Sequence, residues 1–302
     1  MRKRTLWLAA LLSVGLVLTG CGKQESAEPQ GEDRPWQTQV EYSNLTDEAS
    51  REKLTGLMEK AGISEDRRKV FFDHVDQFNG AVSPEELTDG MEKLDITATK
   101  YDPYVMQDEW AAAYPDFMGY NCRITAFGLL GDYMELPADQ TVREDLLFLD
   151  FASLEADSAA IPEPDDLARF KTLYGAVPTQ ASKDVNTHVE LLQQAWADRG
   201  VSFKDNDTAS LVSVFFHDDL DGDVLSIGHV GVLFEAGEDE LYFVEKIAFQ
   251  APYQLDRFSS RAELSDYLMT KYDVSFNQPT ASPFIMENDQ LIEGYRTRPE
   301  QA

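Results

Sequence analysis

The chain has 302 residues, of which 43% are hydrophobic and 11% aromatic, and its formal net charge is −29. This apolar content suffices for a core and argues against a chain that is disordered throughout. The charge argues against a nucleic-acid partner and against docking on anionic lipid, since both need clustered Lys and Arg. Two cysteines exclude a multi-Cys zinc site.

The first twenty residues predict an export signal. Arg2 to Arg4 form a basic start, and the apolar run from Leu6 to Leu18 is too short to span a membrane well. An ordinary signal peptide is one interpretation, but Leu18-Thr19-Gly20-Cys21 resembles the lipobox of bacterial lipoproteins. That resemblance implies cleavage after Gly20, a lipid anchor on Cys21 and a place on the extracytoplasmic face of the cell membrane.

Residues 21–40 predict an acidic, solvated tether, because they are polar and lack apolar periodicity. Residues 41–302 predict a single α+β domain whose helices precede its sheet. Helices are expected at about 46–62, 64–79, 123–134, 145–154, 165–174, 184–199 and 259–272, and 80–119 is expected to be rich in loops. Strands are expected at 210–216, 224–234, 240–249 and 282–286.

Cys122 is predicted at the start of the apolar helix at 123–134. Gly119 and Asn121 favour an irregular entry to that helix. A thiol at a helix N-terminus is favoured as the nucleophilic thiolate, and backbone N–H groups there can hold an oxyanion. The alternative is a buried structural cysteine.

His229 lies inside an otherwise apolar strand, between Gly228 and Gly231. Glycine weakens a strand interior unless something must approach closely, so the pair predicts open space beside the imidazole. The alternative is a core histidine whose hydrogen bonds are satisfied.

The hairpin that follows brings in Glu245. With a five-residue loop at 235–239, His229 and Glu245 are directly opposite each other on one face, whereas a slip of one residue would separate them. A carboxylate beside an imidazole fixes its tautomer and stabilises the imidazolium. The alternative is an exposed acid on an edge strand, paired with a nearby Lys.

These residues resemble the papain-like cysteine peptidases and amidases, above all the cell-wall group that includes the CHAP amidases. The resemblance covers mainly residues 118–130 and 224–250. It implies a papain-like fold, in which a helix carrying the Cys packs on an antiparallel sheet carrying the His and the acid, with extra N-terminal and inserted helices. It implies that Cys122 is the nucleophile, His229 the general base and Glu245 the orienting acid, without a cofactor. Papain's oxyanion Gln is missing, and Tyr120 or Asn121 could replace it.

Most of the chain also resembles an uncharacterised family of lipoproteins, mainly Gram-positive. The shared segments are Tyr42-Ser43-Asn44-Leu45, residues 121–127, Gly228-His229-Val230-Gly231-Val232 and residues 245–254. That resemblance implies no activity.

The preferred hypothesis is a membrane-anchored hydrolase of amide or peptide bonds, acting on a cell-wall peptide or an exported protein. It requires the Cys122 thiol and the His229 ring to lie within about 4 Å of each other in a cleft open to solvent. The alternative is a non-catalytic lipoprotein that binds a ligand or partner. The acidic loop at 218–223 predicts a solvated turn, with a Ca²⁺ site as a weaker option.

Overall fold

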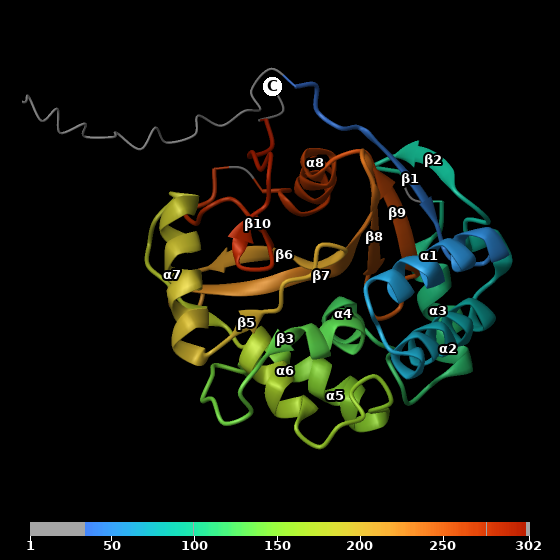
Figure 1. Ribbon diagram of the computed structural model, residues 1–302, viewed down its shortest axis with the longest axis horizontal. Helices are drawn as coiled ribbons and strands as arrows, with labels where there is room; N and C mark the ends of the chain where they lie inside the picture. Colours follow the sequence, from blue (N-terminus) through green and yellow to red (C-terminus); the bar gives the residue numbers. More distant parts are fainter. Residues whose placement is uncertain (1–33, 99, 276, 300–302) are drawn as a thin grey trace, which may run out of the picture.

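The computed structural model describes residues 34–98, 100–275 and 277–299. The signal segment, Cys21 and the tether up to residue 33 lie outside the described residues. The described part is an α+β structure in which helices cover both faces of an antiparallel sheet (Figure 1).

The helices largely follow the predicted order. They are α1 (Glu48–Lys60), α2 (Glu65–Ala81), α3 (Pro103–Ala113), α4 (Cys122–Leu130), α5 (Phe148–Ala156), α6 (Asp166–Tyr174), α7 (Val185–Arg199) and α8 (Arg261–Tyr272). Local side chains set several boundaries: Asp47 and Ser64 cap α1 and α2, and Gly200 ends α7 in the left-handed conformation with φ of 72°. Helix α3 was not predicted, and α4 ends four residues earlier than expected.

The strands are more numerous than predicted. They are β1 (Gln39–Ser43), β2 (Glu92–Asp95), β3 (Met134–Glu135), β4 (Val177–Pro178), β5 (Ser202–Phe203), β6 (Ala209–Asp218), β7 (Val224–Gly237), β8 (Glu240–Lys246), β9 (Tyr253–Phe258), β10 (Phe284–Glu287) and β11 (Gln290–Leu291). The main sheet runs β11-β10-β6-β7-β8-β9-β1-β2, β4 also pairs with β7, and β3 pairs with β5.

Strand β1 corrects the predicted start of the domain. It lies between β9 and β2, although its sequence neighbours are the tether and α1. Arg34 binds both carboxylate oxygens of Asp266 in α8, at 2.7 and 2.9 Å. Residues 34–40, which were expected to belong to the tether, therefore pack on the folded part.

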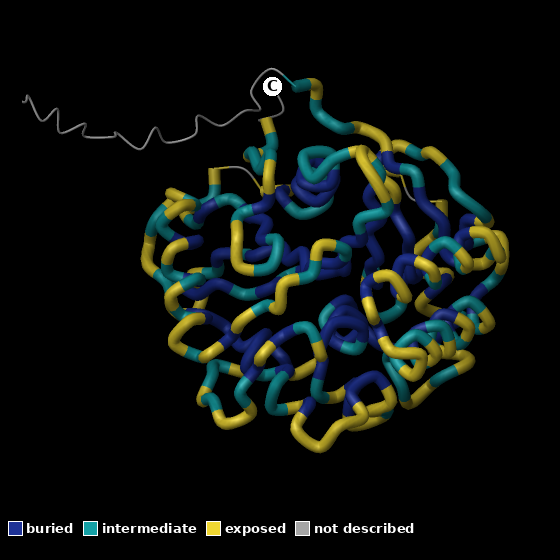
Figure 2. Tube along the Cα trace, in the orientation of Figure 1, coloured by how far each residue is buried: buried dark blue, intermediate teal, exposed yellow. Residues whose placement is uncertain are grey.

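The sheet separates two apolar cores. Val230, Val232 and Phe234 of β7 face the core that contains α4, whereas Leu233 faces the core that contains α8. Figure 2 shows both of these helices as buried. The side chains of α4 and α8 thus meet the central strands from opposite sides, which positions the candidate site.

Candidate active site

The start of α4 is fixed by a buried carboxylate. Asn121 caps the helix by accepting a hydrogen bond from the Ile124 N–H at 3.0 Å, and its amide donates to Asp150 at 2.7 Å. Arg123 binds both oxygens of Asp150, at 2.9 and 2.6 Å. Asp150 is completely buried, so one side chain from α5 holds the residues on both sides of Cys122.

Helix α4 begins where β8 separates from β7. The last pair between these strands is Gly231 with Glu245, and the chain leaves β8 after Lys246. Beyond that pair, Arg123 donates to the Ile227 carbonyl at 2.8 Å, and the Val230 N–H donates to the sulfur of Cys122. The first turn of α4 therefore forms hydrogen bonds with backbone groups of β7 that no longer pair with β8.

The structure brings the three predicted catalytic side chains together. The Cys122 thiol is hydrogen bonded to His229, whose Nε2 is hydrogen bonded to Oε2 of Glu245. Nε2 is thus occupied by the carboxylate. The nucleophile, the base and the orienting acid form one continuous chain of contacts.

The predicted register of the hairpin is wrong by two residues. Its loop is shorter than expected and the ladder is irregular near Ala236, so Gly231, not His229, lies opposite Glu245. Because side chains alternate with a period of two, this slip keeps His229 and Glu245 on one face as diagonal neighbours. Glu245 is 1% exposed on an interior strand, so the alternative of an exposed edge-strand acid is also wrong.

The electrostatics favour an ion pair. Burial opposes the charge on His229, but the carboxylate of Glu245 and the sulfur of Cys122 outweigh it and raise the pKa of His229 to about 9. Burial also opposes a thiolate, yet His229 and Arg123 lower the pKa of Cys122 below its ordinary value. Both shifts stabilise a thiolate beside an imidazolium, the form in which a cysteine nucleophile is active.

The site is covered rather than open. Cys122 is 7% exposed and His229 1%. The predicted open space beside His229 is wrong: a Cβ on Gly228 would meet the ring of Phe216 at 2.1 Å, and one on Gly231 would meet Phe243 at 2.4 Å. These glycines admit neighbouring aromatic rings and not a ligand.

Tyr272 at the end of α8 forms part of the cover. Its ring stacks on the imidazole of His229, with centroids 4.7 Å apart and planes at 20°. Tyr272 and Phe216 also line a hollow of about 390 Å³. The ring of Tyr272 therefore forms a wall between this hollow and His229.

The side chains of Asn121 and Tyr120, the two predicted oxyanion residues, make contacts outside the triad. The Asn121 side chain is engaged at both ends, in the cap and with Asp150. The ring of Tyr120 packs against His74 at 4.2 Å and Phe117 at 5.0 Å. Asn121 accepts from the N–H groups of Ile124 and Thr125, and no acceptor within the described ranges pairs with the N–H groups of Cys122 and Arg123 in the first turn.

Sequence reasoning missed the groups behind Glu245. Tyr267 of α8 donates to Oε1 of Glu245, and the ammonium of Lys271 lies 3.6 Å from the same oxygen. Gln254 of β9 lies opposite Glu245, and its amide donates to Asp256 at 2.5 Å. Tyr267 and Lys271 are four residues apart and share a helix face, which was the available signal.

The acidic loop at 218–223 lacks the arrangement of a Ca²⁺ site. Asp223 pairs with Nε2 of His217 at 2.9 Å, and Asp218 accepts from the Leu220 N–H. Across residues 34–98, 100–275 and 277–299, no three His, Cys, Asp or Glu side chains group closely enough to hold a metal ion.

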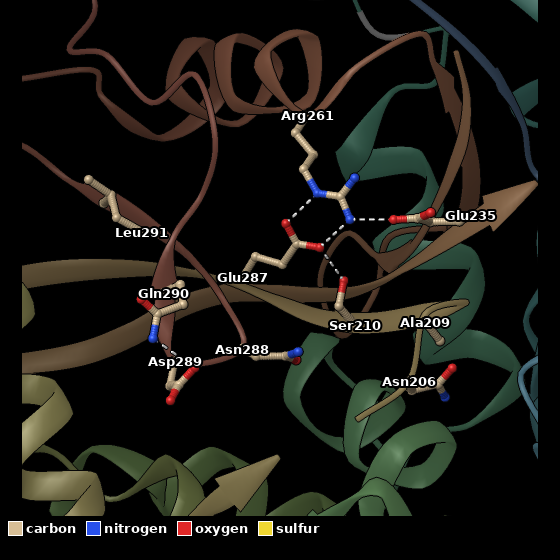
Figure 3. A pocket seen from close by; sticks show the side chains of 10 residues that line it. All are labelled: Asn206, Ala209, Ser210, Glu235, Arg261, Glu287, Asn288, Asp289, Gln290 and Leu291. Atoms are coloured by element: carbon tan, nitrogen blue, oxygen red, sulfur yellow. Dashed lines mark hydrogen bonds and ion pairs between the residues drawn. The ribbon is translucent and has the colours of Figure 1, made fainter. Parts of the chain in front are cut away.

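A separate hollow of about 240 Å³ lies near the β7–β8 turn (Figure 3). Arg261 reaches across it to Glu287 at 2.6 and 2.8 Å and to Glu235 at 2.6 Å, and Ser210 donates to Glu287. Arg261 joins α8, β7 and β10, and the two carboxylates share its guanidinium. We interpret this cluster as a structural contact that links α8 to the sheet.

Comparisons with known proteins agree with an uncharacterised family. Residues 41–292 match the family described as "Domain of unknown function (DUF4300)". No curated protein and no solved structure matches the chain. None of the helices in the described ranges is both long and apolar enough to cross a membrane.

Proposed function

Because the chain belongs to the DUF4300 family, whose function is unknown, we propose its function from its own side chains. We infer that it is a papain-like cysteine hydrolase of amide or peptide bonds, anchored by lipid outside the cytoplasmic membrane. The observation that carries the proposal is the contact chain from the Cys122 thiol at a helix start through His229 to Glu245.

The mechanism is acyl transfer. The Cys122 thiolate adds to the substrate carbonyl carbon, and the resulting oxyanion is held by the amides of Cys122 and Arg123. The imidazolium of His229 gives its proton to the departing amine as the C–N bond breaks, which leaves a thioester. Water then loses a proton to His229 and adds to the thioester, releasing a carboxylic acid and restoring the thiol.

The predicted location of the protein suggests the class of its substrate. A protein anchored through Cys21 outside the membrane meets cell-wall peptides and exported proteins, and we propose one of these as substrate. Replacing Cys21 by Ser should abolish incorporation of labelled palmitate and release the protein from the membrane fraction. A Cys21→Ser protein that keeps the label would overturn the anchor.

The direct test of the site is alkylation of the full chain carrying Cys21→Ser, in which Cys122 is the only thiol. We expect the rate of reaction with iodoacetamide to reach half its maximum at a pH below the ordinary range of a cysteine pKa, because His229 and Arg123 lower the pKa of Cys122. His229→Ala should return the midpoint to the ordinary range. A native thiol that is inert, or that has an ordinary midpoint, contradicts the hydrolase.

One observation favours a second candidate, a non-catalytic lipoprotein that binds a ligand or partner. Cys122 and His229 are both buried, so a substrate must displace their cover. Digestion of peptidoglycan and of exported proteins, followed by mass spectrometry, separates the candidates. Cleavage that is lost in Cys122→Ala supports the hydrolase, whereas binding that survives in Cys122→Ala without cleavage supports the alternative.

A further inference from the structure

Glu245 carries a charge in a place where charge is disfavoured. Its side chain is fully buried, and burial alone would raise the pKa of the carboxyl. Lys271 and His229 outweigh burial and lower the pKa of Glu245 to about 2. Lys271 is only 24% exposed, and its ammonium also donates to the Tyr267 hydroxyl at 2.5 Å. The carboxylate is thus held by one cation on each side.

A second buried carboxyl lies beside the first. Asp256 is completely buried on β9, two residues from Gln254, which is the direct partner of Glu245. Its Oδ1 accepts from Gln254, no donor among the described residues reaches its Oδ2, and the Glu245 carboxyl is its neighbour. Burial and the neighbouring charge of Glu245 raise the pKa of Asp256 well above its ordinary range. Burial and the charge of Glu245 therefore both favour the protonated form of Asp256.

We propose that Lys271 and Asp256 are positioning residues of the triad: Lys271 is the counter-ion that keeps Glu245 ionised, and Asp256 stays neutral. Glu245 then presents a single negative charge to His229. The inference rests on the proposed function. The titratable groups that surround Glu245 come from four segments and are His229, Tyr101, Asp256, Tyr267, Lys271 and Tyr272.

The charged groups around Glu245 form two pairs of opposite charge. The Cys122 thiolate is matched by the His229 imidazolium, and Glu245 by Lys271. If Lys271 is lost, the pKa of the buried Glu245 carboxyl rises, and a carboxyl that takes up a proton no longer attracts the imidazolium. The imidazolium then stabilises the thiolate less, so the thiol loses its proton only at higher pH.

The test uses the full Cys21→Ser chain and the pH profile of Cys122 alkylation by iodoacetamide. Lys271→Met should shift the midpoint upward by about one unit, which makes alkylation on the acidic side about tenfold slower. Lys271→Arg should restore it. Asp256→Asn, which imitates a protonated carboxyl, should leave the midpoint in place. Thermal unfolding shows that each variant is folded before its profile is read.

The outcomes are distinguishable from those of the proposed function. An ordinary midpoint in the Cys21→Ser parent contradicts the hydrolase itself. A low midpoint that Lys271→Met does not move contradicts only the role of Lys271. A midpoint that falls in Asp256→Asn shows that Asp256 was ionised and overturns its role. If a substitution prevents folding, the NMR titration of His229 in Lys271→Arg and Asp256→Asn decides: a shift of the imidazole titration in either variant overturns the proposal.

Discussion

Two carboxylate clusters lie on the central sheet, separated along β7 by the six residue steps from His229 to Glu235, roughly 20 Å of strand. Around Arg261, the carboxylates of Glu235 and Glu287 are 40% and 15% exposed and both pair with the guanidinium. Around Glu245, burial is complete and the carboxylate faces an imidazole that faces a thiol. The first cluster lines a hollow, whereas Glu245 lines neither of the two hollows described above, so the candidate site is marked by buried, perturbed groups more than by open space.

The largest expected effect is a loss of stability in Asp150→Ala, and it tests whether Asp150 also positions Cys122. Asp150→Ala leaves the buried Arg123 without its partner and should lower the free energy of unfolding by about 3 kcal/mol or more, measured by urea denaturation. Asp166→Ala is the matched control, because Asp166 is equally buried and pairs with Arg169 at 2.8 Å. Both should lose similar stability, but only Asp150→Ala should move the pH profile of Cys122 alkylation. Equal profiles in the two variants would contradict a role for Asp150 in placing Cys122.

The buried cluster should also appear in the acid dependence of stability. The pKa of Glu245 is lowered from 4.5 to about 2 in the fold, so its stabilisation is fully present above pH 4.5 and is lost as the pH falls toward 2. The unsubstituted chain should therefore lose roughly 3 kcal/mol more than Glu245→Gln across this window. Urea denaturation at a series of pH values measures the difference. Parallel curves for the two proteins would show that Glu245 is not ionised in the fold.

Removing the cover should expose the thiol without changing its acidity. Tyr272→Ala should accelerate alkylation of Cys122 about tenfold at pH values where the thiol is fully ionised, which corresponds to roughly 1.4 kcal/mol. Tyr272→Phe keeps the ring that stacks on His229 and should react at the original rate. If Tyr272→Ala reacts no faster, the stacked ring does not limit access to the site.

The smallest effect is expected at the exposed cluster. Arg261→Met removes contacts that are partly exposed to solvent, and such pairs contribute little, so the free energy of unfolding should fall by at most about 1 kcal/mol. The alkylation profile of Cys122 should not change. A loss as large as that of Asp150→Ala, or a shifted profile, would remove the distinction between the two clusters.

Much of the site could be predicted because its parts carry local signals. Cys122 follows a capping Asn121 at the head of an apolar helix, and that geometry holds. His229 and Glu245 share a face because alternation along a strand survives a slip of two residues. The open space expected from Gly228 and Gly231 was wrong, since a glycine in a strand indicates a close neighbour without saying which one.

The sequence by itself determined the α+β composition, most helix boundaries and the three side chains of the candidate triad, because caps and periodicity act within a few residues. Only the tertiary structure decided that β1 joins β9, that α4 begins where β8 leaves β7, that Asp150 binds Arg123 and that Lys271 lies beside Glu245. Those contacts join segments far apart in the chain, and no local pattern encodes which partners meet. Burial then sets the charges, because the same carboxyl is ordinary at the surface and strongly perturbed beside an imidazole in the core.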